Sequence, residues 1–398
     1  MFKKVKLTGS LYYVGVNDRS KVLFENMWPL PYGISYNSYL IVDEKTALID
    51  TVDSCYSEEF LQKIETALEG RSLDYLIINH MEPDHSGSLK DLLRVYPDVT
   101  LVGNSKTFDM TDGFYGINDH TLVVKEEDEL SLGKRNLHFY LTPMVHWPET
   151  MMTYDTTDFT LFSGDAFGCY RALNGGILDK DLDASLYYSE MIRYYSNIVG
   201  KYGSPVQKAL KKLASLEIKT ICSTHGPVWQ TEIDKVISIY DKLSKYEAED
   251  GVVIIYGSMY GNTAKMAEAI ATELSACGVK HIAVHNVTAS NSSYILEDVF
   301  RYKGVIIGSP TYNTGLYPEI ESILKKIENR EIKNRYFGYF GSFSWANGAS
   351  KQLALFAERI KWEVIGTPIE NKMGLNSDSY RACEALAKAM AERLLSSR

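Results

Sequence analysis

The chain opens with short apolar segments separated by polar turns. Two strand-like segments, residues 39–42 and 46–50, flank the polar segment 43–45, which is the arrangement of a β-hairpin. Residues 57–68 have a helical spacing of apolar side chains, at Phe60, Leu61, Ile64 and Leu68. Short apolar runs indicate buried strands at 75–78, 100–102, 137–141, 160–162 and 220–222.

The pattern changes near residue 248. Residues 244–251 are polar and charged, and from Val252 onward strands and helices alternate, with clear strands at 252–255, 304–308 and 336–340. Such alternation is typical of a doubly wound parallel sheet. We therefore expect two domains, residues 1–248 and 249–398. The length of 398 residues also favours two domains.

The composition of the chain disfavours several classes of protein. No apolar run approaches the ~20 residues of a membrane span, and the N-terminus lacks the pattern of a signal peptide, so we expect a cytoplasmic protein without membrane contact. A net charge of −9 disfavours nucleic-acid binding. The 5 cysteines are scattered without a Cys-x-x-Cys pair, which argues against a disulfide framework, a zinc ribbon or a rubredoxin module within the chain.

Four metal-ligand side chains lie within six residues, directly after the strand at 75–78. They belong to the segment His80-Met81-Glu82-Pro83-Asp84-His85. Imidazoles and carboxylates packed so closely need a cation or solvent to offset repulsion and desolvation. The segment therefore predicts a metal site.

Three later segments each supply one more ligand-type residue just after an apolar run: His146, Asp165 and His225. Loops at strand ends are where folds usually place ligands. The whole order resembles the metallo-β-lactamase superfamily, whose motif His-x-His-x-Asp-His is followed by a His, an Asp and a His. The resemblance implies an αββα sandwich with a binuclear metal site.

The sequence departs from that motif at Glu82, where those hydrolases have histidine. A carboxylate adds negative charge and a hard oxygen ligand, which shifts the preference from zinc toward iron. The motif His-x-Glu-x-Asp-His on this scaffold resembles the flavodiiron proteins, and the resemblance extends over essentially the whole chain.

The resemblance implies a role for each motif residue. One iron takes His80, Glu82 and His146, the second takes Asp84 and His225, and Asp165 bridges the two. His85 is either a further ligand or a neighbour that handles protons. By position, Tyr195 is a second candidate to donate protons or hydrogen bonds near the distal iron.

The second domain contains a loop that suits a phosphate. The segment 256–263 lies between a strand and a helix, so backbone N–H groups and hydroxyls can bind a phosphate there without Lys or Arg. It resembles the flavodoxin phosphate loop, and two later strand-end loops resemble those that hold the flavin ring. The implied FMN-binding residues are Ser258, Met259, Tyr260, Gly261, Asn262, Thr263, Pro310, Thr311, Tyr312, Asn313, Ser342, Phe343, Ser344, Trp345 and Gly348.

A diiron site and FMN in one chain imply an electron relay. We expect reduction of O2 to water, of NO to N2O, or of both. The chain ends at Arg398 without an NADH-oxidising domain, so electrons are expected from a separate donor. In the family that donor is rubredoxin or, in some members, reduced coenzyme F420, and subunits form a head-to-tail homodimer or a dimer of dimers.

Two alternatives stay open at this point. The first is a zinc hydrolase of the glyoxalase II type fused to a flavodoxin, against which Glu82 counts. The second is a non-catalytic electron carrier or gas sensor with a degenerate metal site, against which the filled ligand positions count.

Overall fold

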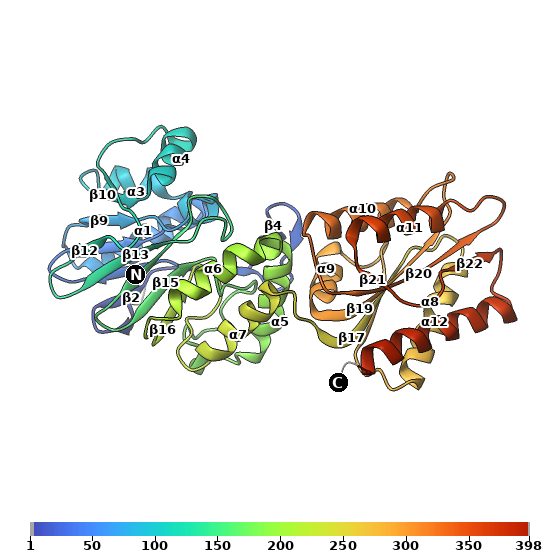
Figure 1. Ribbon diagram of the computed structural model, residues 1–398. Helices are drawn as coiled ribbons and strands as arrows, with labels where there is room; N and C mark the ends of the chain where they lie inside the picture. Colours follow the sequence, from blue (N-terminus) through green and yellow to red (C-terminus); the bar gives the residue numbers. More distant parts are fainter. Residues whose placement is uncertain (1–3, 397–398) are drawn as a thin grey trace. The chain divides into compact units, whose positions relative to one another are not determined.

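A computed structural model describes residues 4–396 and divides the chain into two compact units, Met1–Asp241 and Lys242–Arg398 (Figure 1). The division falls within helix α7 (Ile233–Ser244), a few residues before the predicted boundary at residue 248, which stays a prediction. Each unit is described below by itself.

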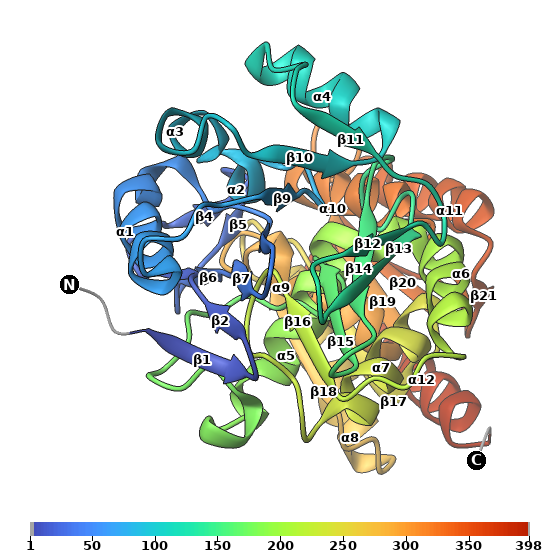
Figure 2. The same cartoon turned by 90° about the vertical axis from the view of Figure 1, so that its left-hand side faces the viewer.

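Two sheets form the centre of the first unit (Figure 2). The seven-stranded sheet has the order β1 (Val5–Thr8), β2 (Leu11–Tyr13), β7 (Tyr39–Val42), β8 (Thr46–Ile49), β9 (Tyr75–Ile77), β10 (Thr100–Gly103), β11 (Thr121–Val123). The five-stranded sheet has the order β12 (Glu129–Ser131), β13 (Asn136–Leu141), β14 (Met151–Asp155), β15 (Thr160–Gly164), β16 (Thr220–Ser223). The predicted hairpin is confirmed as the antiparallel pair β7–β8.

Helices cover both sheets, which confirms the predicted αββα sandwich. On the side of the seven-stranded sheet lie α1 (Ser57–Leu68), α3 (Leu89–Val95) and α4 (Ser105–Tyr115). On the other side lie α6 (Gly203–Leu213) and α7, preceded by α5 (Ser185–Tyr194) (Figure 2). Helix α1 has the predicted bounds because Phe60, Ile64 and Leu68 share one buried face.

Short elements complete this unit. Two antiparallel strand pairs are β3 (Val16–Asp18) with β6 (Ile34–Tyr36) and β4 (Leu23–Phe24) with β5 (Trp28–Pro29). The one-turn helix α2 (Pro83–Ser86) follows β9. Single turns of 3-10 helix lie at Ser54–Tyr56, Asp179–Asp181 and Gly200–Tyr202, and a π-helical turn lies at Tyr195–Val199.

The second unit is a parallel sheet between two helix layers. The strand order is β18 (Ile282–Asn286), β17 (Glu249–Tyr256), β19 (Tyr302–Pro310), β20 (Tyr336–Phe343), with β21 (Glu363–Val364) and β22 (Ile369–Lys372) both pairing β20. The helices are α8 (Asn262–Ala276), α9 (Ser292–Arg301), α10 (Pro318–Asn329), α11 (Ala349–Ile360) and α12 (Ser377–Leu395). The predicted doubly wound sheet is confirmed.

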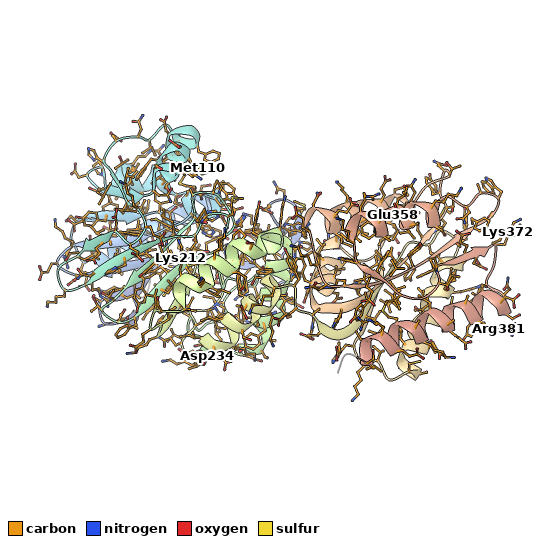
Figure 3. The ribbon with its side chains drawn as sticks, viewed as in Figure 1. Met110, Lys212, Asp234, Glu358, Lys372 and Arg381 are labelled. Carbon is orange, nitrogen blue, oxygen red and sulfur yellow. The ribbon has the colours of Figure 1, made fainter. Side chains whose placement is uncertain are left out.

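The core of this unit explains its layers. Helices α8 and α12 pack on each other, and their buried residues Ile270, Leu274 and Leu386 belong to one hydrophobic core, while α10 and α11 lie across the sheet from them (Figure 1). Outward-facing positions of α11, β22 and α12 carry the exposed charges Glu358, Lys372 and Arg381 (Figure 3). Strands β17, β19 and β20 end at one edge of the sheet, where parallel α/β sheets bind ligands.

Across residues 4–396, none of the helices combines the length and the hydropathy that crossing a bilayer requires.

Candidate metal centre and flavin site

The six-residue motif is held between strand β9 and helix α2. The buried carboxylate of Asp50 accepts hydrogen bonds from the backbone N–H groups of Asn79 (2.7 Å) and His80 (3.3 Å). Helix α2 begins at Pro83, which suits a first helical position because proline lacks an N–H. The loop therefore presents His80 and Glu82, whereas Asp84 and His85 are presented by the helix turn.

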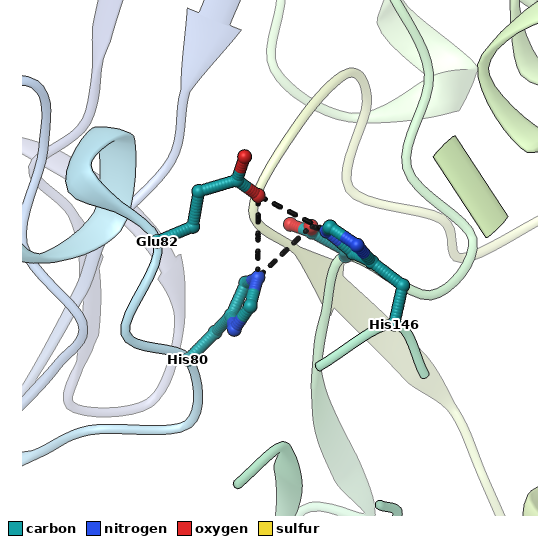
Figure 4. Close-up of side chains that lie close together, drawn as sticks. His80, Glu82 and His146 are labelled. Carbon is teal, nitrogen blue, oxygen red and sulfur yellow. Dashed lines mark hydrogen bonds and ion pairs between the residues drawn. The ribbon is translucent and has the colours of Figure 1, made fainter. Parts of the chain in front are cut away.

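Four side chains from three segments converge to form what we call the His80 group: His80, Glu82, His146 and Asp165. Their ligand atoms all lie within 4.8 Å of one another (Figure 4). Oε2 of Glu82 is 3.3 Å from Nε2 of His80 and 3.0 Å from Nε2 of His146. Oδ2 of Asp165 is 3.5 Å and 3.1 Å from the same two nitrogens.

The Asp84 group consists of Asp84, His85 and His225. Oδ2 of Asp84 lies 3.4 Å from Nε2 of His85 and 3.3 Å from Nε2 of His225. Oδ1 of Asp165 lies 2.9 Å from the His85 nitrogen and 3.7 Å from the His225 nitrogen. Asp165 therefore presents one carboxylate oxygen to each group.

The chemistry of these side chains fits a pair of metal ions. All members of both groups are buried. Both oxygens of Asp84, both ring nitrogens of His85 and Nε2 of His225 lack a hydrogen bond of favourable geometry, although Nε2 of each histidine lies at ion-pair distance from Asp84. Buried polar atoms without partners are costly, and a metal ion is the partner that such converging carboxylates and imidazoles accept. Three carboxylates with four imidazoles suit iron better than zinc.

Without metal, protons balance the charges of this cluster. Burial alone would lower the histidine pKa values, but the adjoining carboxylates raise the pKa of His85 and His146 to about 9 and that of His80 well above its usual range. Burial opposes ionisation of Asp165 too, yet the neighbouring histidines hold its pKa well below the ordinary value. Metal binding must therefore release protons from the imidazoles.

Three of these side chains are oriented by hydrogen bonds to residues that belong to neither group. Nδ1 of His80 donates to Oε1 of Glu149 (2.8 Å), and Nδ1 of His225 donates to the carbonyl of Ser35 (2.7 Å). The hydroxyl of Thr224 donates to Oδ1 of Asp165 (2.6 Å). Sequence reasoning missed Glu149; the available signal was a carboxylate three residues after His146 in the same segment.

Aromatic side chains surround the Asp84 group. The Tyr194 ring centroid lies 5.5 Å from that of His225, and Phe24 packs edge-on to the same imidazole at 5.6 Å. The Tyr194 hydroxyl is buried without a hydrogen-bond partner. The ring of Tyr195 packs against Tyr240 at 5.1 Å. Tyr194, which the sequence did not single out, thus packs at a tilt beside the imidazole of His225, and the role of Tyr195 stays a prediction.

The second unit contains a cavity of about 470 Å³ at the carboxyl edge of its sheet. Three loops that follow β17, β19 and β20 form most of the lining, and Met373 joins them from the end of β22. The lining residues are Ser258, Met259, Tyr260, Asn262, Thr263, Pro310, Thr311, Tyr312, Asn313, Thr314, Ser342, Phe343, Ser344, Trp345, Ala346 and Met373. The structure thereby brings together the predicted loops and adds Thr314, Ala346 and Met373, which the sequence did not indicate.

The first loop has the form of a phosphate cradle. The Ser258 hydroxyl accepts hydrogen bonds from the backbone N–H groups of Gly261 (3.1 Å) and Ala264 (3.4 Å). Gly261 has φ +88°, a conformation that glycine adopts most readily, and it is the N-cap of α8. The first N–H groups of a helix have no partner within it, so this end of α8 suits the terminal phosphate of FMN.

Aromatic rings flank the space beyond the cradle. Trp345 is 90% exposed and Tyr312 is 42% exposed, although both line the cavity. Such rings suit stacking on an isoalloxazine ring. Gly348 lies outside the lining: a Cβ there would stand 1.8 Å from the carbonyl oxygen of Thr314, so this glycine allows two loops to approach.

Two protein families match this chain, one in each of the two structural units. Residues 34–226 match the family described as ODP family beta lactamase. Residues 254–385 match the flavodoxin family.

Curated relatives match over most of the chain. A nitric oxide reductase from Moorella thermoacetica is 31% identical over 399 residues, which cover 99% of this chain and 100% of that protein. An anaerobic nitric oxide reductase flavorubredoxin from Escherichia coli is 32% identical over 366 residues, which cover 91% of this chain and 76% of the relative.

Solved structures are similar over the full length. The rubredoxin oxygen:oxidoreductase from Desulfovibrio gigas superposes with a TM-score of 0.95 at 30% identity and covers 99% of both chains. The flavodiiron protein from Giardia intestinalis also superposes with a TM-score of 0.95, at 28% identity. The superposition covers 100% of this chain and 98% of the Giardia chain.

Proposed function

The chain belongs to the flavodiiron protein family, and from this premise we propose that it reduces O2 to water, NO to N2O, or both. The proposal rests on the position of Asp165: its two carboxylate oxygens face two separate groups of candidate ligand side chains. A carboxylate in that position can bridge two iron ions. Names of relatives support the reaction class, since they include a nitric oxide reductase and a rubredoxin oxygen:oxidoreductase.

The cofactors are two non-haem iron ions and FMN. We assign the first iron to His80, Glu82 and His146, and the second to Asp84 and His225, with Asp165 between them. His85 belongs with the second iron, because its Nε2 converges with Asp84 and with the ligand atom of His225. When bound, the iron pair supplies binding and reduction of the oxidant, and FMN supplies single electrons.

The chain's own residues prepare the site for that chemistry. Glu149 and Ser35 hold Nδ1 of two imidazoles, so that each Nε2 faces the metal position. Burial and the nearby carboxylates raise the pKa of Tyr194 well above its usual value. Its hydroxyl therefore keeps its proton at neutral pH and can donate a hydrogen bond to a small molecule beside His225. Tyr195 is the alternative donor.

For FMN, we propose that the cradle at Ser258 and Thr263 binds the phosphate while Tyr312 and Trp345 pack against the ring. The exposed state of both rings and their position on one cavity support this assignment. The hydroxyl of Thr263 lies 2.9 Å from that of Ser342, which joins the first loop to the third.

Electrons come from an external donor, for which we propose rubredoxin or reduced coenzyme F420. The name of the Desulfovibrio gigas relative supports rubredoxin. We also propose that the protein works in the cytoplasm as a head-to-tail homodimer or a dimer of dimers, in which the flavin of one subunit serves the metals of the next.

The zinc hydrolase alternative is not favoured, because Glu82 lies 3.0 Å from His146 within the His80 group and adds a hard ligand there. A non-catalytic carrier or sensor is disfavoured because every ligand position is filled and converges.

Steady-state turnover tests the proposal. The purified protein, loaded with iron and FMN, is given one chemically reduced donor and either O2 or NO in separate electrode assays. A preference above about tenfold in kcat/KM, roughly 1.4 kcal/mol of barrier, assigns the physiological oxidant. Consumption of neither gas would support the carrier or sensor, and stoichiometric zinc with thioester hydrolysis would support the hydrolase.

A further inference from the structure

The side chain of Glu149 lies directly behind His80. Its Oε1 accepts hydrogen bonds from Nδ1 of His80 (2.8 Å) and from the backbone N–H of Met81 (2.9 Å). Because the Met81 amide can only donate, Oε1 is an acceptor, so the proton of the His80 contact resides on Nδ1. The backbone carbonyl of Glu149 in turn accepts from Nδ2 of Asn104 (2.5 Å), and Glu149 is only 1% exposed.

The histidine at the other metal position has a different partner. Nδ1 of His225 donates to the backbone carbonyl of Ser35, a neutral acceptor, at 2.7 Å. A carboxylate partner makes an imidazole more basic, and hence a stronger metal ligand, than a neutral partner does. Among the carboxylates that belong to a group or accept from Nδ1 of its histidine, the His80 group thus has two besides Asp165, Glu82 and Glu149, whereas the Asp84 group has Asp84 alone, and Asp165 contributes one oxygen to each.

We infer that Glu149 is a positioning residue that makes the two iron positions electronically unequal: it stabilises ferric iron beside His80, so the first electron resides at the Asp84 group. This inference rests on the iron pair of the proposed function. The step is a one-electron transfer from reduced FMN, which is oxidised, to the diferric pair, which becomes one ferric and one ferrous ion. No bond is made or broken.

A redox titration of the protein loaded with iron and FMN tests the inference. The half-reduced pair is followed by electron paramagnetic resonance, which gives one midpoint potential for each electron. Glu149→Gln retains the acceptor Oε1 and removes the charge. A smaller preference for ferric iron, on the order of tenfold, raises the second midpoint by about 59 mV, and the first midpoint rises by less.

Asp179→Asn is the matched control. Asp179 is a buried carboxylate whose Oδ2 accepts from the backbone N–H groups of Gln230, Thr231 and Glu232. Its loss should leave both midpoints unchanged. A Glu149→Gln protein with unchanged midpoints, or with the larger shift in the first step, overturns the inference.

If Glu149→Gln does not retain iron, the test uses Glu149→Asp instead. The shorter aspartate side chain keeps the negative charge but holds it farther from His80. The second midpoint should then rise more than the first, and an unchanged second midpoint overturns the inference. Because the midpoints are measured without O2 or NO, an absence of gas reduction in the parent protein would count against the proposed function and leave this test intact.

Discussion

Oδ1 of Asp165 lies 2.9 Å from Nε2 of His85. The other oxygen of the same carboxylate faces His146, at 3.1 Å. One side chain at the end of β15 therefore serves two groups of ligands that come from distant parts of the chain. We therefore expect retention of both metals to depend on Asp165.

Substitution of Asp165 tests that dependence. Asp165→Asn replaces one carboxylate oxygen with an amide NH2, which cannot ligate iron, so at least one of the two iron ions should be lost. Metal analysis after anaerobic reconstitution measures this. Asp158→Asn is the control, because Asp158 binds Arg135 and Thr160 and takes part in neither group. A full pair of iron ions in the Asp165→Asn protein would rule out a bridging role.

Glu82 should decide between iron and zinc. Glu82→His removes a hard carboxylate and adds an imidazole, so iron retention should fall and zinc uptake should rise. Competition with equal iron and zinc, followed by metal analysis, gives the ratio. Glu82→Gln should lose iron without gaining zinc. Unchanged iron content and activity in Glu82→His would count against the assignment.

The stability of the metal-free protein should fall as pH rises from about 6.5 to about 9. The pKa values of His85 and His146 are about 9 in the folded protein against the ordinary 6.5, so their contribution is complete below 6.5 and is lost as pH passes through 9. The loss is at most about 3 kcal/mol per histidine. Urea unfolding at pH 6.5 and 9.5 measures it. Iron affinity should change in the opposite direction, because deprotonated imidazoles bind metal.

Trp345 should contribute to FMN affinity without supporting the fold. Its ring is 90% exposed and lines the cavity, so Trp345→Ala should leave thermal stability of the FMN-free protein unchanged. Loss of stacking, about 0.5–1.5 kcal/mol, should weaken FMN roughly 2- to 10-fold. Quenching of flavin fluorescence on titration gives the Kd. Leu355→Ala, an exposed apolar position of α11 outside the cavity, should bind FMN as the parent does.

Two tyrosine variants should separate neighbouring residues. Tyr194→Phe removes a buried hydroxyl without a hydrogen-bond partner next to His225, so stability and iron content should stay constant while kcat falls, by about tenfold or more if the hydroxyl donates a hydrogen bond to the oxidant. Tyr195→Phe is the comparison and should have the smaller effect. The reverse order of kcat values would favour the sequence-based choice of Tyr195. Steady-state assays with each gas, alongside metal analysis, distinguish these outcomes.

Sequence patterns correctly indicated those features of the protein whose residues lie within one short stretch of the chain. Helix α1 was predicted with its observed bounds because its apolar face repeats every three to four residues. The phosphate cradle was recognisable because its hydroxyls and glycine lie within six residues of one another, from Ser258 to Thr263. Likewise, the motif from His80 to His85 indicated a metal site because four ligand types crowd one segment.

Partners brought from elsewhere in the chain could not be predicted in this way. The Nδ1 hydrogen bond of His225 is accepted by Ser35, 190 residues away in sequence, through a backbone carbonyl that every residue type possesses. Met373 reaches the flavin cavity from the end of β22, which has no motif. The role of Glu149 became visible only through its contact with His80, 69 residues away in sequence.

The sequence by itself determined which chemistry is present: the ligand types, their order and the replacement of a histidine by Glu82, since each is a property of residue identity. Only the tertiary structure decided how those ligands are divided. It places His85 with Asp84 and His225, gives Asp165 to both groups and puts a carboxylate behind one histidine and a carbonyl behind another. These relationships are distances between side chains on separate strands, which only the packing of the two sheets and their loops establishes.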